Sequence, residues 1–227
     1  MNVRMAIRGV VGVVASLALA AGGAGPAVAQ SSGAVPSGSE IRVGATYEES
    51  TLIGVTGDLV SPYLFDPIDS FQCEVIHNAD HMIVEMDTWP ITTPSGGYLW
   101  SGGDTDLRCG TEQTSGWWHI QSRHQKSTAA HPNSWETIRD SASAVLGYET
   151  YFSWDDFMWM AVQDMFTYPM ETSYEGNDKV CISNTFSIWK DDVPVYTFWV
   201  NTIASRNNLL IISAYPSDIM YLSDCYD

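Results

Sequence analysis

Three runs of strand-forming residues near the C-terminus restrict the fold of this chain more than any other feature. They read "KVCISNTFSIW", "VPVYTFWVNTI" and "LLIISAY", and all are rich in β-branched and aromatic residues. Short turns at Lys190–Asp192 and Ser205–Asn208 separate them. Such runs predict an antiparallel meander, and its sheet must bury one face against other elements.

Two helices are predicted before this meander. Asn133 and Glu136 form a capping-box pattern ahead of "SWETIRDSASAVL", and Ser153 and Asp156 form another ahead of "WDDFMWMAVQDMF". Apolar residues of the second helix recur as one stripe that we expect in the core: Phe157, Met158, Ala161, Val162, Met165 and Phe166. Helices followed by a meander predict an α+β domain with helices packed on one face of the sheet.

The preceding region, residues 40–106, is expected to consist of strands and loops. "EIRVGATYEESTLIGVTGDLV" contains short β-branched runs, and "FQCEVIHNADHMIVEMDTW" has the pattern of a hairpin that turns at Asn78–Asp80. We expect this region to form one compact unit with the α+β region, residues 107–227.

The first 29 residues have the pattern of a secretory signal peptide. Arg4 and Arg8 precede an apolar run of small residues, and "AVA" at 27–29 fits a cleavage site. Residues 30–39, rich in Ser and Gly, are expected to be a flexible leader. No later run approaches the ~20 apolar residues that span a bilayer. We therefore expect an exported, soluble protein that has no membrane contact after cleavage.

Four widely spaced cysteines fit an exported protein. They favour two disulfides over a zinc site, because no C-x-x-C pair occurs. Three pairings are open. We favour Cys109–Cys181 with Cys73–Cys225, because the second bond would tie down the C-terminus.

The charge of the chain argues against a polyanionic partner, but its distribution does not. Without Arg4 and Arg8, eight basic residues remain against 27 acidic ones, a net charge of −19 that repels polyanions. Half of those basic residues and three of the five histidines lie within 108–139: Arg108, Arg123, Lys126, Arg139, His119, His124 and His131. The cluster fits either an anion-binding patch or cations that balance acids elsewhere on the surface.

The stretch "GWWHIQSRHQK", residues 116–126, is the first candidate site. Thr114 or Ser115 can cap a helix here, on which His119 and Arg123 share a face while His119 and His124 diverge by about 140°. That spacing does not suit a helical metal pair, but it suits an imidazole that transfers a proton beside a guanidinium that holds an anion. The alternative is that the tryptophans bury the helix and its polar residues face water.

Two other sequence patterns are candidate sites. His77 and His81 in "HNADH" have the i,i+4 spacing of a zinc pair, but a hairpin tip is the better interpretation, so no metal or cofactor is expected. Ser213 and Tyr215 in "LLIISAYP" are two residues apart, which places both hydroxyls on one face of a strand.

From about Leu107 to Pro216 the chain resembles bacterial RNase toxin domains of the barnase/EndoU/colicin/RelE kind, including the RNase A-like toxins of contact-dependent inhibition systems. The motifs that carry the resemblance are "SGWWHIQSRHQ", "WDDFMWMAVQDMF" and the strand end "LLIISAYP". In those families a helix-borne histidine and a basic residue act with a Thr and a Tyr on a late strand. The resemblance implies His119 or His124, with Arg123, Ser213 and Tyr215, where Ser213 replaces the usual threonine.

The implied function is a metal-independent endoribonuclease that acts on RNA and has an immunity or inhibitor protein as a further partner. Histidine would supply acid and base catalysis, and Arg123, Ser213 and Tyr215 would stabilise the charged phosphate. The competing hypothesis is a non-catalytic secreted protein that binds a protein or a glycan. It is favoured by the strongly acidic charge and by residues 40–106, which the resemblance does not cover.

Overall fold

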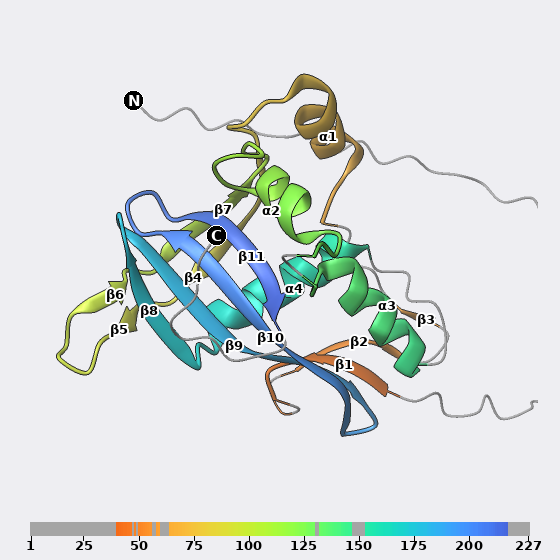
Figure 1. Cartoon of the computed structure of the whole chain (residues 1–227). Helices are drawn as coiled ribbons and strands as arrows, with labels where there is room; N and C mark the ends of the chain where they lie inside the picture. The colour runs from red at the N-terminus through yellow and green to blue at the C-terminus, as the bar shows by residue number, and fades with distance from the viewer. Residues whose placement is uncertain are drawn as a thin grey trace, which may run out of the picture. The chain divides into compact units, whose positions relative to one another are not determined.

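The computed structural model describes residues 40–46, 48, 50–55, 58–59, 64–129, 132–146 and 153–217. The chain divides into two units, 1–35 and 36–227, and all described residues belong to the second. The unit is α+β, as the sequence predicts, with helices packed against a large curled sheet (Figure 1).

The predicted meander is confirmed and forms the middle of the sheet. Its strands are β9 (Lys179–Lys190), β10 (Val193–Ser205) and β11 (Leu210–Ser217). Both pairings are antiparallel, and a bulge at Ile203/Ala204 shifts the register between β10 and β11. Strand β9 has 12 residues and β10 has 13. The edge of β9 that faces away from β10 is long enough to pair with two further strands, β1 and β8.

Shorter strands extend the sheet on both sides. The order is β3–β2–β1–β9–β10–β11–β7–β4, and β8 also pairs with β9. These strands are β1 (Glu40–Gly44), β2 (Thr51–Val55), β3 (Asp58–Leu59), β4 (Met82–Thr88), β7 (Gly103–Arg108) and β8 (Glu171–Gly176). A separate small hairpin joins β5 (Ile91–Thr92) to β6 (Tyr98–Trp100).

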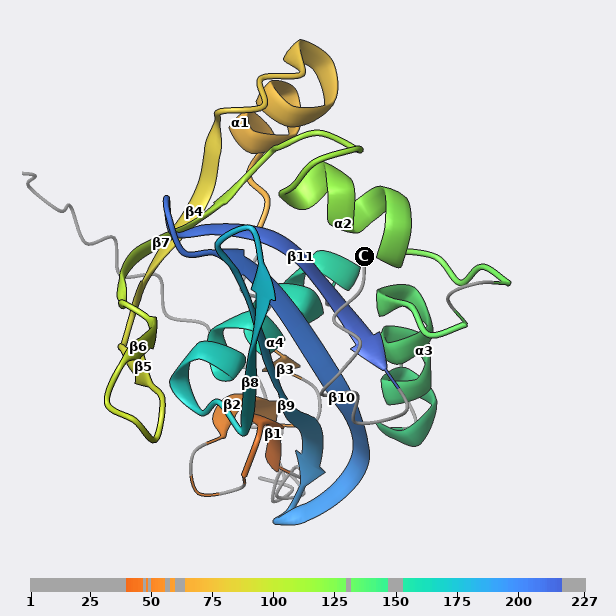
Figure 2. The same cartoon turned by 60° about the vertical axis from the view of Figure 1, so that its left-hand side comes forward.

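Helix α4 (Trp154–Thr167) supplies most of the helical part of the core. Ser153 and Asp156 form the predicted capping box at its start. The predicted apolar stripe is confirmed, because each of its members is 2% exposed or less: Phe157, Met158, Ala161, Val162, Met165 and Phe166. Figure 2 shows α4 lying behind the central strands.

Helix α3 (Trp135–Leu146) begins one residue later than its predicted cap implies. The side-chain oxygen of Ser134 accepts a hydrogen bond from the Thr137 amide at 3.2 Å, so Ser134 rather than Asn133 caps the helix. Trp135 is fully buried, and its indole N–H donates to the carbonyl of Ala214 at 2.9 Å. This bond ties α3 to β11.

The predicted hairpin at Asn78–Asp80 is wrong in its first arm. The segment forms a short helix, α1 (Pro67–Ser70), continued by a π-helical turn, η1 (Phe71–Ile76); only the second arm is a strand, β4. Asp66 and Asp69 form a capping box around Pro67 at the first helical position. These start signals outweigh the β-branched residues that follow.

The favoured disulfide pairing is also wrong. Cys73 of η1 is bonded to Cys109, which follows β7, across 36 residues. The bond is possible because the helix places the Cys73 side chain inward, where it is fully buried. Cys181 is disulfide-bonded as well, and Cys225 lies outside the described residues.

Candidate functional site

Helix α2 (Trp117–His124), which carries the candidate histidines, begins between the ends of two strands. The Gly116 amide donates to the Ile212 carbonyl of β11 at 3.0 Å, and the Trp118 amide donates to the Cys109 carbonyl at 2.9 Å. Strands β7 and β11 pair at one position, Leu210 with Asp106. The start of α2 therefore links β11 to Cys109, the residue that follows β7, beyond the single position at which the two strands pair.

The N-cap residue of α2 is Gly116, not the predicted Thr114 or Ser115. Its φ of +83° favours glycine, and an added Cβ would lie 2.5 Å from the Arg108 carbonyl oxygen. Because the glycine has no side chain to cap the helix, the contacts with β11 and Cys109 fix the helix start instead.

Both candidate histidines turn inward and meet. His119 and His124 are each 3% exposed, and their ring centroids are 6.3 Å apart, although their positions on the helix diverge. Nδ1 of His119 donates to the Glu112 carbonyl at 2.9 Å. Since a carbonyl can only accept, this bond makes Nε2 the unprotonated nitrogen of a neutral His119 ring.

Tyr215 joins the histidines from the strand. Its ring stacks on His124 with centroids 4.9 Å apart and an interplanar angle of 27°. The register places Tyr215 opposite Asn201, whose side-chain oxygen accepts from Ser183 Oγ at 2.5 Å. Helix α2 and strand β11 thus bring together residues about 90 positions apart in the sequence.

Ser213 is on the same strand but makes no comparable contact. It is fully buried, and its hydroxyl has no hydrogen-bond partner in the part of the chain that the structure describes. A buried hydroxyl without a partner costs roughly 1–3 kcal/mol. Ser213 therefore lies close to Tyr215 on β11, but its hydroxyl contributes no hydrogen bond to the histidine–tyrosine cluster among the described residues.

The basic cluster is partly neutralised within the fold. Arg108 binds Asp106 at 2.7 Å, and Arg139 binds Asp140 at 2.8 Å. Arg123 is exposed, and within the described ranges it forms no ion pair. Lys126 is likewise exposed, whereas His131 lies outside the described residues. Arg123 is thus exposed, whereas His119, one helical turn before it, is buried, and Tyr215 is half-buried.

The other histidine pattern has a structural partner. Nε2 of His81 lies 2.8 Å from an Asp69 carboxylate oxygen, and His77 ends η1 with a left-handed φ of +56°. The two residues do not share a helix. Among the described residues, no group of three His, Cys, Asp or Glu side chains could hold a metal ion.

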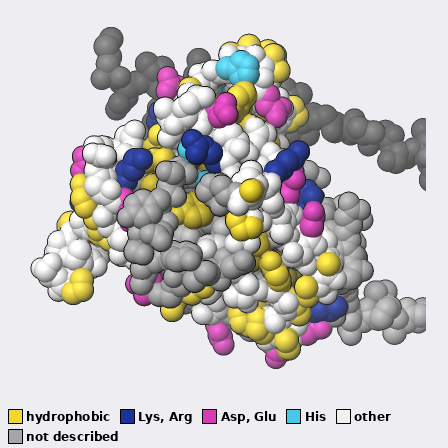
Figure 3. Space-filling model, in the orientation of Figure 1, with side chains coloured by type: hydrophobic (Ala, Val, Ile, Leu, Met, Phe, Trp, Pro, Cys, Tyr) yellow, Lys and Arg dark blue, Asp and Glu magenta, His cyan; other side chains and the backbone are white. Residues whose placement is uncertain are grey.

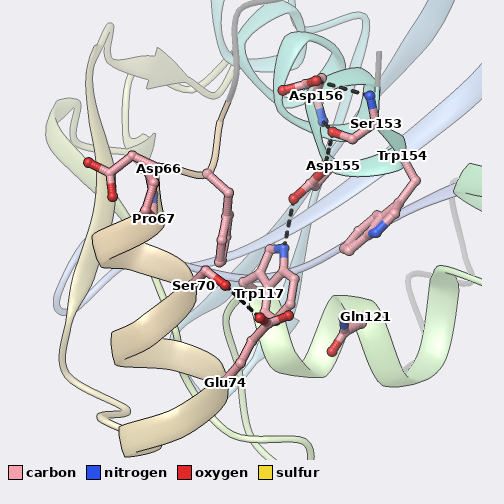
Figure 4. Close-up of a pocket in the computed structure, with 11 residues that line it drawn as sticks. Asp66, Pro67, Ser70, Glu74, Trp117, Gln121, Ser153, Trp154, Asp155 and Asp156 are labelled. Carbon is pink, nitrogen blue, oxygen red and sulfur yellow. Dashed lines mark hydrogen bonds between the residues drawn. The ribbon is translucent and has the colours of Figure 1, made fainter. Parts of the chain in front are cut away.

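A second candidate site, which sequence reasoning missed, lies between η1 and the starts of α2 and α4 (Figure 4). It is a pocket of about 430 Å³ with aromatic and acidic walls. Its lining residues are Phe65, Asp66, Pro67, Ser70, Glu74, Trp117, Gln121, Ser153, Trp154, Asp155 and Asp156. The one local signal was the repeated acid after Ser153, which also serves as helix capping.

Asp155 links this pocket to α2. Its carboxylate accepts from the Trp117 indole N–H at 3.3 Å and from the Ser153 hydroxyl. Burial raises the pKa of Asp155 above its ordinary value, against the lowering effect of the Ser153 hydrogen bond, and the neighbouring Asp156 charge raises it further. A carboxyl group with a raised pKa thus holds the first residue of the histidine-bearing helix.

Comparisons with protein-family models, with curated proteins and with solved structures find no match for this chain. The fold and the two candidate sites define it as a disulfide-containing α+β protein in which two buried histidines lie beside a half-buried tyrosine. Among the described helices, none has the length and apolar character needed to cross a membrane.

Proposed function

We propose that the protein is a metal-independent endoribonuclease whose catalytic groups are on α2 and β11. The observation that carries the proposal is the stack of His124 on Tyr215 with His119 alongside. A resemblance based on short motifs would pair a helix histidine with a strand tyrosine. The contact between His124 and Tyr215 is a feature of the fold and not of the motifs, so it is separate support for that pairing.

The reaction follows from the chemistry of the groups. The 2′-hydroxyl of RNA attacks the adjacent phosphorus, the bond to the 5′-oxygen breaks, and one imidazole removes a proton while another group supplies one. The Glu112 carbonyl directs Nε2 of His119 toward the role of base. His124 would then be the acid, and Arg123 and Tyr215 would stabilise charge on the phosphoryl oxygens.

The burial of both imidazole rings limits how RNA can reach them. His119 and His124 are 3% exposed, so we expect RNA to approach from the side of Arg123 and Tyr215 and to open the structure around the rings. Few phosphates would be contacted, because two of the four cations in the cluster are bound to aspartates. The activity should therefore depend only weakly on salt.

The decisive experiment incubates purified, oxidised protein with RNA in EDTA over a range of salt and pH. The His119→Ala/His124→Ala variant should lose cleavage, and His77→Ala, which removes an exposed histidine outside the cluster, should retain it. Arg123→Ala changes an exposed residue and should lower cleavage without unfolding the protein. RNA left intact by the wild-type protein in every condition would contradict the proposal.

We also propose that the protein is exported, with cleavage after Ala29. The Cys73–Cys109 disulfide supports this, because disulfides persist in oxidising compartments. Mass spectrometry of culture medium should find a chain that begins at Gln30. A full-length chain retained inside the cells would contradict export.

A further inference from the structure

The helical segment Pro67–Ile76, formed by α1 and η1, presents an apolar face to solvent. Ile68 is 64% exposed, Phe71 51% and Val75 62%, at positions i, i+3 and i+7. Figure 3 shows hydrophobic side chains beside acidic ones at the top of the molecule, over α1. Large exposed apolar residues gathered on one helix face are typical of interaction sites.

The neighbouring face of the same segment lines the pocket of Figure 4. Ser70 and Glu74 each precede a residue of the apolar face, Phe71 and Val75, so the two faces lie about a quarter-turn apart. Figure 4 shows Glu74 near Trp117, with its carboxylate bonded to the Ser70 hydroxyl at 2.6 Å. A partner that covers the apolar face therefore reaches the pocket.

The charge of the pocket selects the kind of side chain that enters. Among its described lining residues, four carry carboxylates and none is Lys, Arg or His. Both oxygens of Asp156 already accept backbone amides, from Leu64 and Ser153. Glu74 and Asp155 retain acceptor capacity, because a carboxylate has about four lone-pair sites.

The walls of the pocket suit the stem of a basic side chain. Phe65 and Trp117 have ring centroids 4.5 Å apart, and Trp117 and Trp154 are 5.8 Å apart, which gives a continuous aromatic row. Aliphatic stems pack on such rings, and a guanidinium or ammonium group is attracted to them. Arginine is also among the residues most enriched at interface centres.

The segment Pro67–Ile76 is held in place within this chain, without a bound partner. Cys73, on the side away from the apolar face, is fully buried and bonded to Cys109. Asp66 and Asp69 cap the start of the segment. A surface fixed in this way loses little conformational entropy on binding.

We propose that Pro67–Ile76 is a docking surface for a partner polypeptide that lays apolar side chains on Ile68, Phe71 and Val75 and inserts an arginine or lysine into the adjacent pocket. This role is separate from RNA cleavage and uses different residues. The partner is basic where it meets this chain, because the pocket is acidic and the whole chain carries a net charge of −17.

The test titrates N-acetyl-L-arginine amide into isotopically labelled protein and follows the indole N–H signals of Trp117 and Trp154 by NMR. These signals should shift in a saturable manner, and N-acetyl-L-citrulline amide, which lacks the charge, should not shift them. Glu74→Gln should weaken binding by about fivefold, whereas Asp80→Asn, an exposed acid outside the pocket, should leave it unchanged. Equal shifts with the citrulline amide, or undiminished binding to the Glu74→Gln variant, would overturn the proposal.

The apolar face is tested with an acetylated Leu-Arg-Leu-Leu amide peptide. It should bind more tightly than the arginine amide, and Phe71→Ser should remove that gain while leaving binding of the arginine amide intact. Dimerisation of the protein that Phe71→Ser abolishes would assign the face to a second copy and contradict the proposal. All these readouts measure binding, so they stand whether or not RNA is cleaved.

Discussion

The ring of His124 on α2 stacks on the ring of Tyr215 on β11, with centroids 4.9 Å apart. This contact joins a helix to a strand that lies on the far side of two other helices in the sequence. The stack orients the imidazole, and the phenol places a hydroxyl in the same cluster. Its importance to function can be separated from its importance to folding.

Tyr215→Phe keeps the stack and removes the hydroxyl. We expect RNA cleavage to fall by about a hundredfold if that hydroxyl stabilises the phosphoryl charge. The free energy of unfolding should change by no more than about 1.5 kcal/mol, the contribution of one hydrogen bond. Initial rates and urea unfolding measure the two effects. Tyr98→Phe alters an exposed tyrosine elsewhere and serves as the control; unchanged cleavage by Tyr215→Phe would rule out the assigned role.

Gly116→Ala should destabilise the protein by about 2–3 kcal/mol in urea unfolding, because a positive φ and a Cβ 2.5 Å from a carbonyl oxygen act together. Gly96→Ala is a matched control, since Gly96 has a φ of +84° but no atom within 4 Å of the added Cβ. It should cost about 1 kcal/mol. Equal losses for the two variants would show that close packing at the start of α2 is unimportant.

Removal of the Cys73–Cys109 bond by a Cys73→Ser/Cys109→Ser double variant should lower the free energy of unfolding by about 2–4 kcal/mol, as expected for a loop of 36 residues. Pro67–Ile76 would lose its anchor first. Limited proteolysis should therefore cut this segment in the variant and spare it in the oxidised wild-type protein. Resistance of both proteins would show that the segment does not need the disulfide.

The raised pKa of Asp155 predicts a pH-dependent stability difference. A carboxyl whose pKa is higher in the folded than in the unfolded protein contributes stability that is present at low pH and is lost as pH rises through the folded value. The Tm of the wild-type protein relative to Asp155→Asn should therefore be most favourable at pH values below the ordinary pKa of an aspartate and should decline as pH rises above it. Comparing the two proteins removes the contribution of the other acids. A difference that grows with pH would contradict the direction of the shift.

The sequence predicted the parts of the fold that depend on local pattern. The apolar stripe of α4, the Ser153–Asp156 capping box and the β9–β11 meander follow from periodicity and turn spacing, and all are confirmed. Strand alternation also placed Ser213 and Tyr215 together, but it could not show that Ser213 is fully buried. Burial depends on which elements cover a strand.

The helical segment 67–76 differs from the predicted hairpin, although its start carries a local helix signal. Asp66, Pro67 and Asp69 mark a helix start, yet the β-branched residues that follow favoured a hairpin. The disulfide error has a different origin: the favoured pairing rests on tying down the C-terminus, whereas the fold places Cys73 of η1, fully buried, against Cys109. The pocket could not be predicted at all, because Glu74, Trp117 and Asp155 come from three elements that meet only in the folded chain.

Cleavage of RNA by the purified, oxidised protein in the presence of EDTA tests the central claim most directly. The account predicts cleavage by the wild-type protein and by His77→Ala, and loss of about a hundredfold or more in the His119→Ala/His124→Ala variant. Cleavage that persists in that double variant, or intact RNA with the folded wild-type protein, would contradict it.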